Sequence, residues 1–299
     1  MKPAFLPREP FLASVRDPEA PVVLLGAPLD VTTSFRPGTR FGPARIRAVS
    51  DGLEDYSPIQ DGSLLDVPFY DAGDVDLSPG RIRSSLEAIE EAVADIVGRG
   101  RLPIILGGEH LLTLAAVTGV ARHVPDVVVI QFDAHADLRD DYLGEKLSHA
   151  TVMRRVAEVI GPERLYQLGI RSGTADEFRF GREHTNFHPL PLGSAGGSLV
   201  ELAERTVRAV GDRPVYVTID IDVVDPGYAP GTGTPEPGGV SPGELLQALV
   251  ALRPLRVVGL DIVEVCPPQD ASDVTSVLAA KLVREAVIGF GGKFRSGRS

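Results

Sequence analysis

At 299 residues with a formal net charge of −11, the chain is too acidic to suggest a nucleic-acid partner, because phosphate binding needs clustered Lys and Arg side chains. No apolar run approaches the roughly 20 residues that span a bilayer, and residues 1–6 lack the features of a secretory signal, so we expect a cytoplasmic protein with no membrane partner. The only cysteine, Cys266, excludes an intrachain disulfide and a thiolate metal cage.

Apolar runs of strand length alternate with stretches of helix length along the whole chain. The predicted strands are 22–26, 67–71, 102–106, 127–132, 165–169, 215–220 and 257–261. The predicted helices include 84–97, 150–160, 199–210, 242–252 and 271–288. Near-continuous apolar strands separated by helices are typical of a parallel sheet covered on both faces. We predict one domain over residues 1–299, an α/β fold with three α/β/α layers around a mainly parallel sheet.

Side chains that can bind metal follow three of these strands. They are His110 after strand 102–106, Asp133, His135 and Asp137 after strand 127–132, and Asp220 and Asp222 at the end of strand 215–220. On extended backbone, alternate side chains point the same way, so Asp133, His135 and Asp137 could converge on one site. Sites in open parallel sheets form outside the carboxyl ends of the strands, where all three clusters are predicted to lie.

The ligand set contains only nitrogen and oxygen, which suits Mn²⁺, with Fe, Co, Ni or Zn as substitutes. Two such ions can acidify a shared water and supply hydroxide at neutral pH. A single cluster of this kind could be an adventitious acidic run. Three clusters argue for function, because buried carboxylates are costly without a counter-charge. The sequence therefore predicts hydrolysis at a two-metal centre, and phosphate hydrolysis is less favoured because no basic cluster lies nearby.

Two further side chains could act on a substrate. Glu264 follows strand 257–261 and could accept hydrogen bonds from a guanidinium, or it could form a structural ion pair. His149 stands at a predicted helix start, where it could shuttle protons or serve as a capping or surface histidine. The Pro- and Gly-rich segment 225–243 is too long for a casual connection, and long ordered loops are usually functional.

These motifs resemble those of the ureohydrolase family, which includes the arginases and agmatinases. The matching segments, in order, are Gly26–Asp30, Phe35–Pro43, Asp71–Asp74, Gly107–His110, Asp133–Asp137, Thr218–Pro226, Ala229–Glu236 and Asp261–Val265. Glu109 departs from the Asp that is commonest before the ligand histidine, although Glu occurs there in agmatinase-like members.

The resemblance implies a homo-oligomer, a trimer or hexamer, with two Mn²⁺ ions per subunit and an arginase-like fold. The implied ligands are His110, Asp133, Asp137 and Asp220 for one ion, and Asp133, His135, Asp220 and Asp222 for the other. In the family, the hydroxide between the ions attacks the guanidinium carbon and the products are urea and an amine. Catalytic roles fall on His149, Glu264 and Asp137, with His149 as proton shuttle. Glu264, Thr234 and His149 would contact the substrate.

Within the family, segments 35–43, 108–110 and 230–236 look like those of agmatinases. Segment 139–147 does not resemble the loop with which arginases read an α-amino acid. We therefore expect agmatine, a small cationic guanidine, as the substrate. Arginine, 4-guanidinobutyrate, aminopropylagmatine and formiminoglutamate are alternatives that keep the chemistry and change the tail.

Two alternatives to a ureohydrolase are a non-catalytic protein and an enzyme of different chemistry. A non-catalytic binding or regulatory protein that keeps the fold would be marked by a lost ligand, shuttle or guanidinium carboxylate, and this chain keeps all of them. A metal-dependent deacetylase or phosphatase would explain Glu264 and the Gly-Thr-Gly-Thr segment 231–234 less naturally.

Overall fold

The computed structural model describes residues 4–190 and 197–297. Over these residues its largest sheet has the strand order β1-β5-β2-β6-β11-β10-β7-β8-β9. The strands are β1 (Phe5–Leu6), β2 (Val22–Ala27), β5 (Phe69–Val75), β6 (Leu102–Gly107), β7 (Val128–Phe132), β8 (Leu165–Ile170), β9 (Asn186–Pro189), β10 (Pro214–Asp220) and β11 (Arg256–Val263). Only the short edge strand β1 runs antiparallel to its neighbour within this sheet. A separate hairpin pairs β3 (Tyr56–Ser57) with β4 (Gly62–Ser63).

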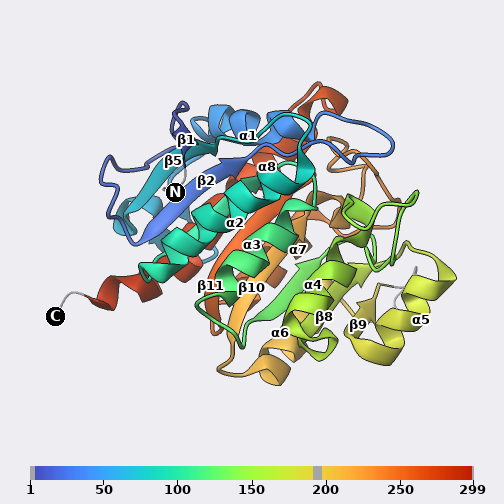
Figure 1. Cartoon of the computed structure of the whole chain (residues 1–299). Helices are drawn as coiled ribbons and strands as arrows, with labels where there is room; N and C mark the ends of the chain where they lie inside the picture. The colour runs from blue at the N-terminus through green and yellow to red at the C-terminus, as the bar shows by residue number, and fades with distance from the viewer. Residues whose placement is uncertain (1–3, 191–196, 298–299) are drawn as a thin grey trace.

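Helices cover both faces of the sheet. They are α1 (Gly42–Ser50), α2 (Ile82–Gly98), α3 (Leu112–Ala121), α4 (Val152–Ile160), α5 (Ala175–His184), α6 (Leu199–Val210), α7 (Pro242–Ala251) and α8 (Val274–Gly291). In Figure 1, α2, α3 and α4 lie across the near face, while α7 and α8 lie behind the strands. Helices α1 and α6 contribute to the same core cluster as α7 and α8. The apolar core is split in the same way, with one cluster on each face. This is the three-layer arrangement around a mainly parallel sheet that the sequence predicts.

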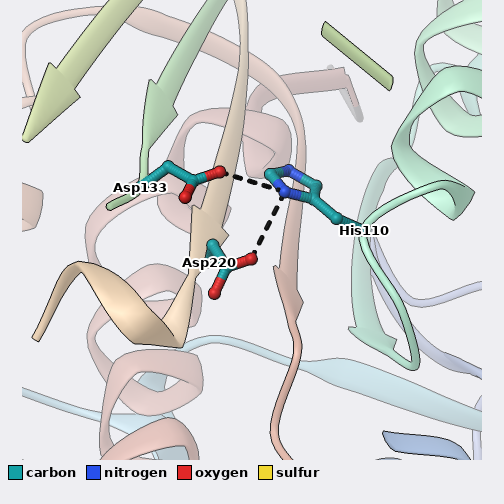
Figure 2. A group of neighbouring side chains, drawn as sticks. All are labelled: His110, Asp133 and Asp220. Carbon is teal, nitrogen blue, oxygen red and sulfur yellow. Dashed lines mark ion pairs between the residues drawn. The ribbon is translucent and has the colours of Figure 1, made fainter. Parts of the chain in front are cut away.

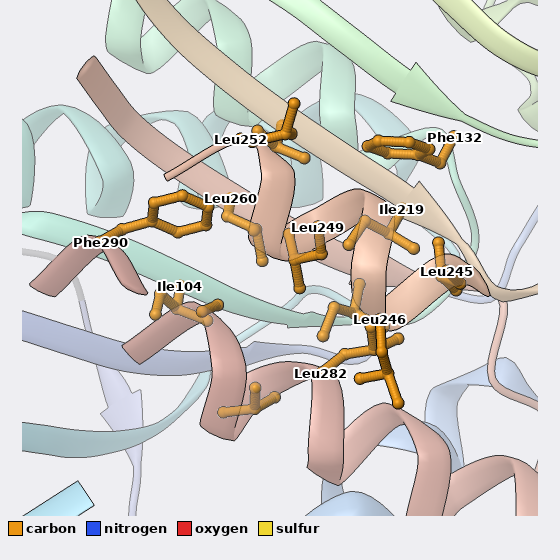
Figure 3. Close-up of a cluster of buried hydrophobic side chains, with 14 of the residues drawn as sticks. Ile104, Phe132, Ile219, Leu245, Leu246, Leu249, Leu252, Leu260, Leu282 and Phe290 are labelled. Atoms are coloured by element: carbon orange, nitrogen blue, oxygen red, sulfur yellow. The ribbon is translucent and has the colours of Figure 1, made fainter. Parts of the chain in front are cut away.

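The core on the α7 and α8 side shows how the helices are fixed to the sheet. Ser241 caps the start of α7 by accepting a hydrogen bond from the Glu244 amide, and Pro242 occupies the first turn. Leucines of α7 then pack toward strand residues such as Ile219 and Leu260 (Figure 3). Each fully buried side chain of this size contributes about 1.5–3 kcal/mol relative to an exposed one, so the strands and their ends are held rigidly.

The described residues contain elements that the hydrophobic pattern did not reveal. Helix α3 is apolar on nearly all sides, so it lacks the polar face that marks an amphipathic helix. Helix α5 is largely polar, and strand β9 ends in a proline at the edge of the sheet. Strand β5 spans Phe69–Val75, so it begins two residues and ends four residues after the predicted strand 67–71. Across the described ranges no helix is both long and apolar enough to cross a membrane.

Candidate metal centre

The carboxyl ends of five neighbouring strands, β6, β11, β10, β7 and β8, lie side by side in the sheet. His110 follows β6, Glu264 follows β11, and Asp220 ends β10. The segment 133–137 follows β7, and His135 forms an isolated bridge with Ser172, which follows β8. The parallel topology therefore gathers side chains from five separate stretches of sequence at one edge.

One group of ligand atoms surrounds the His110 imidazole. Its Nδ1 lies 3.2 Å from Asp133 Oδ2, 3.2 Å from Asp137 Oδ2 and 3.4 Å from Asp220 Oδ2. Figure 2 shows the Asp133 and Asp220 carboxylates reaching the ring from two neighbouring strands. The ligand atoms of His110, Asp133 and Asp220 are close enough together to hold one ion.

A second group shares Asp133 with the first. His135 Nδ1 lies 2.9 Å from Asp222 Oδ2 and 3.7 Å from Asp133 Oδ1. The ligand atoms of Asp133, His135 and Asp222 could hold a second ion. The structure thus brings all six predicted ligands together in two groups, with Asp133 in both.

The segment after β7 reaches this arrangement by a turn and not by continued strand alternation. Strand β7 ends at Phe132, and Asp137 has a positive φ of 54°. The Asp133 carboxylate accepts hydrogen bonds from Gln131 Nε2 and from the His135 amide, each 2.6 Å long. The three side chains converge as the sequence predicts. They do so because the backbone turns after Phe132 and not because the strand continues to Asp137.

The cluster is strongly acidic and buried, and its electrostatics fit a bound cation. Burial, followed by the charges of Asp222 and Asp137, raises the pKa of Asp133 to about 7. Burial, followed by the charges of Asp222 and Asp133, raises the pKa of Asp220 well above its ordinary value. His110 Nδ1 is buried and has no hydrogen-bond partner among residues 4–190 and 197–297, although it faces three carboxylates. A nitrogen left free among carboxylate oxygens is the arrangement expected of ligands around a divalent ion.

Behind His110, a buried polar network fixes the other side of the ring. His110 Nε2 lies 2.9 Å from the Thr218 hydroxyl, and Thr218 contacts Thr113. Thr113 and Tyr216 both donate hydrogen bonds to Asp261 Oδ2, at 2.8 and 2.7 Å. Histidines that bind metal through one nitrogen usually donate from the other to such a partner. The network therefore suits Nδ1 as the metal-binding atom.

Glu264 lies beside the cluster with one oxygen fixed. Its Oε1 accepts a 2.7 Å hydrogen bond from the His110 amide, and its own amide donates to Gly108 O. Burial raises the pKa of Glu264 to about 8, so a cationic ligand would stabilise its charged form. Thr234 comes from the Pro- and Gly-rich loop, and its hydroxyl lies 3.4 Å from Asp222 Oδ2.

His149 is half-buried at the start of a short helical turn before α4. Burial lowers its pKa below the ordinary value. The Tyr142 ring packs edge-on against it, with ring centres 5.7 Å apart. The capping role considered for His149 falls to Ser148, whose hydroxyl accepts from the turn and forms a capping box with Thr151.

A cleft of about 250 Å³ opens above the cluster. All of the predicted site residues line it except Asp133 and Asp222, which are buried at 0% and 1% exposure. The cleft also has an outer wall, formed by Arg139, Tyr142, Ser172, Gly173, Thr174 and Glu177. The sequence reasoning considered segment 139–147 as a whole but named none of these side chains as site residues. Two features of the sequence could have pointed to the 172–177 part of the wall. They are the Thr174-x-x-Glu177 capping-box pattern at the start of α5 and the position of this stretch directly after strand β8.

Comparisons with known proteins identify the family of this chain. The Arginase family matches residues 20–289. An agmatinase from Bacillus anthracis is 47% identical over 274 residues, 91% of this chain and 92% of that protein. A guanidinobutyrase from Pseudomonas aeruginosa is 37% identical and covers 87% of this chain and 83% of its own length.

A solved structure supports the same relationship. The agmatine ureohydrolase of Thermoplasma volcanium has a TM-score of 0.85 and 32% identity, covering 98% of this chain and 97% of that one. Fold and sequence therefore agree with known ureohydrolases along nearly the whole chain. The chain belongs to the arginase family and is a ureohydrolase enzyme.

Proposed function

We propose that this protein is an agmatinase, a hydrolase that converts agmatine and water to urea and putrescine. The observation that carries the proposal is that six nitrogen and oxygen ligands and the Glu264 carboxylate gather at one cleft, with Asp133 and Asp222 buried within the cluster. The agmatinase relatives and the agmatine ureohydrolase structure support the choice of substrate.

The metal site would be filled by two Mn²⁺ ions. His110, Asp133, Asp137 and Asp220 would hold one ion, and Asp133, His135, Asp220 and Asp222 the other. The donor set is carboxylate and imidazole, which suits Mn²⁺. Burial and neighbouring carboxylates raise the pKa of Asp133, and a bound cation would stabilise its charged form. When bound, the two ions lower the pKa of water and so supply hydroxide at neutral pH.

Glu264 would bind and orient the guanidinium. One of its oxygens is held by the His110 amide, and Oε2 accepts no hydrogen bond within the part of the chain that the structure describes. A carboxylate and a guanidinium form strong, directional, charge-assisted hydrogen bonds. Because Glu264 contacts the His110 amide and lines the same cleft, it would hold the substrate carbon near the ligand cluster.

His149 would move the proton that completes the reaction. Hydrolysis adds water across a C–N bond, and the departing amine must gain a proton as that bond breaks. His149 lines the same cleft as Glu264, and its lowered pKa keeps it neutral near neutral pH. It can therefore take the proton lost from water and donate it to the amine nitrogen.

The substrate tail would extend along the outer wall. Agmatine and 4-guanidinobutyrate share the guanidinium but carry opposite charges at the far end. The wall offers the Arg139 guanidinium, the Tyr142 ring and the Glu177 carboxylate, and a guanidinobutyrase lies among the relatives. The wall thus allows 4-guanidinobutyrate as the second candidate substrate.

Urea release by the Mn²⁺-loaded protein tests the proposal, with agmatine, arginine and 4-guanidinobutyrate compared at equal concentrations. We expect urea from agmatine at a clear excess, with putrescine formed in equal amount. Urea from 4-guanidinobutyrate alone would keep the chemistry and replace the substrate. No urea from any of the three, with two ions bound, would contradict the proposed activity.

A further inference from the structure

The segment 31–34 joins the metal-ligand stretch to His149. Glu109 precedes the ligand His110, is fully buried, and turns its carboxylate toward this segment. Its Oε2 accepts hydrogen bonds from the Val31 amide at 3.0 Å and the Thr32 amide at 2.7 Å, and its Oε1 accepts one from the Thr32 hydroxyl at 3.0 Å. Glu109 therefore holds the segment by three hydrogen bonds.

Thr32 passes this constraint on to His149. A threonine hydroxyl has one proton to donate, and Thr32 gives it to Glu109, so its oxygen is left as an acceptor. That oxygen accepts a 3.0 Å hydrogen bond from the His149 amide and lies 3.4 Å from His149 Nδ1. On the other side of the ring, the Ser34 hydroxyl lies 3.2 Å from Nε2. One short segment thus contacts both ring nitrogens.

The fixed direction of the Thr32 hydroxyl favours one of the two tautomers of the neutral His149 imidazole. If Nδ1 carried no proton, its lone pair would face a lone pair of Thr32. The Ser148 hydroxyl lies 3.3 Å from the same nitrogen, but it can rotate to donate or accept, so it does not decide the question. Thr32 therefore favours a proton on Nδ1, which leaves Nε2 free to accept one.

We propose that Glu109, acting through the Thr32 hydroxyl, is a positioning residue that orients His149 and keeps its resting proton on Nδ1. Nε2 is then the atom that takes the proton lost from water and gives it to the leaving amine. The catalytic consequence rests on the proposed function, whereas the orientation of His149 and its resting proton can be measured without turnover. Glu109 has the length to reach Thr32 from the end of β6, and in its ionised form its carboxylate can only accept from that hydroxyl.

Two substitutions at Thr32 test the contact without touching a metal ligand. Thr32→Val keeps the shape and removes the hydroxyl, and Thr32→Ser restores the hydroxyl. We expect Thr32→Val to lower kcat for agmatine by about tenfold to a hundredfold, because misplacing a catalytic group by about 1 Å has effects of this size. KM and metal content should stay near those of the parent, and Thr32→Ser should recover most of the rate.

Thr33→Val is the matched control. It removes the neighbouring hydroxyl, which contacts Asp30 and has no contact with His149 among the described residues. If Thr33→Val lowers kcat as much as Thr32→Val does, a general loosening of the segment explains the loss and the proposal is overturned.

A spectroscopic measurement tests the proton position directly. In ¹⁵N-labelled protein loaded with diamagnetic Zn²⁺, the ring nitrogen shifts of His149 show which nitrogen carries the proton at alkaline pH. His149→Asn identifies its signals. We expect a protonated Nδ1 in the parent and in Thr32→Ser, and a loss of that preference in Thr32→Val. A parent ring protonated on Nε2 would overturn the proposal whatever the rates are.

Glu109→Gln tests the hydrogen bond from the Thr32 hydroxyl to Glu109. A glutamine amide can donate to the Thr32 oxygen and so release the Thr32 proton toward Nδ1, and we expect the ¹⁵N signature to shift toward a protonated Nε2. An unchanged signature in Glu109→Gln and Thr32→Val would overturn the proposal. If both variants keep the parent kcat while His149→Asn loses it, the positioning role fails and the proposed function stands. If His149→Asn itself keeps the parent rate, the proposed shuttle fails.

Discussion

The floor and the outer wall of the cleft are built in different ways. The floor consists of strand-end residues such as Asp133 and Asp220, which are 0% and 3% exposed and fixed by neighbouring parallel strands. The wall joins the loop that carries Arg139 and Tyr142 to the first turn of α5, where Arg139 lies 3.5 Å from Glu177 and over the Tyr142 ring. A rigid floor suits bond-breaking chemistry that depends on precise geometry. The wall carries the partly exposed Arg139 on a loop, and loops commonly carry the residues that select a substrate.

Removing a floor carboxylate should have the largest effect. We expect Asp133→Ala to lose bound metal and nearly all urea release, because Asp133 belongs to both ligand groups. Metal analysis and a urea assay measure the two losses, with exposed Asp126→Ala as the control. If Asp133→Ala kept two ions per chain, Asp133 could not be a shared ligand.

Replacing His149 should separate proton transfer from metal binding. We expect His149→Asn to lower turnover by about 10²–10⁴-fold, the usual contribution of general acid–base catalysis, with metal content unchanged. Turnover and metal content would be measured on the same samples. Parent-like turnover across neutral and alkaline pH would show that His149 carries no proton.

The loop that supplies Thr234 to the cleft is anchored by Asp225. Its carboxylate accepts hydrogen bonds from the amides of Gly227, Gly238 and Gly239, and these contacts, the first from Gly227, lower the pKa of Asp225. A folded-state pKa below the unfolded value adds stability above the unfolded pKa of about 3.9 and loses it as the pH falls.

Asp225→Asn should therefore lower Tm at neutral pH, by about 2–4 °C for each kcal/mol lost. The gap from the parent should narrow as the pH approaches about 4, where the Asp225 carboxylate in the unfolded chain becomes protonated. Thermal unfolding at a series of pH values measures this. A gap that stays constant with pH would mean that the charge of Asp225 does not anchor the loop.

The wall should give the smallest and most selective effect. Arg139 is a partly exposed cation, so its removal should raise KM for anionic 4-guanidinobutyrate relative to cationic agmatine by about two- to fivefold, in line with weak exposed charge interactions. We expect kcat for agmatine to stay near the parent value, and Arg139→Lys to keep the parent ratio. An unchanged KM ratio in Arg139→Ala would remove Arg139 from tail selection.

The sequence was sufficient to predict the three layers and to gather the floor residues. Strands such as 215–220 are apolar throughout, and their ends carry side chains whose chemistry is plain. The geometry after β7 was not predictable, because the positive φ of Asp137 and the hydrogen bonds of Asp133 depend on the folded turn. The roles of Asp137, Thr234 and Glu264 stay predictions, as do the single domain, the cytoplasmic location and the trimer or hexamer.

The wall escaped prediction for a different physical reason. Glu177 accepts a hydrogen bond from the Leu138 amide, 39 residues away in sequence. No local sequence pattern predicts a contact between residues so far apart. Thr32 and Glu109 are 77 residues apart and are linked in the same way. Residues that act through tertiary contacts carry no signature of their own, whereas metal ligands placed at strand ends do.

The most direct test titrates Mn²⁺ into metal-stripped protein while bound ions and urea release from agmatine are followed together. The account predicts two ions per chain, with urea release reaching its full rate only when both are bound. Full activity in the metal-free protein, or no urea with two ions bound at the cluster, would contradict the central claim that this strand-end site hydrolyses agmatine.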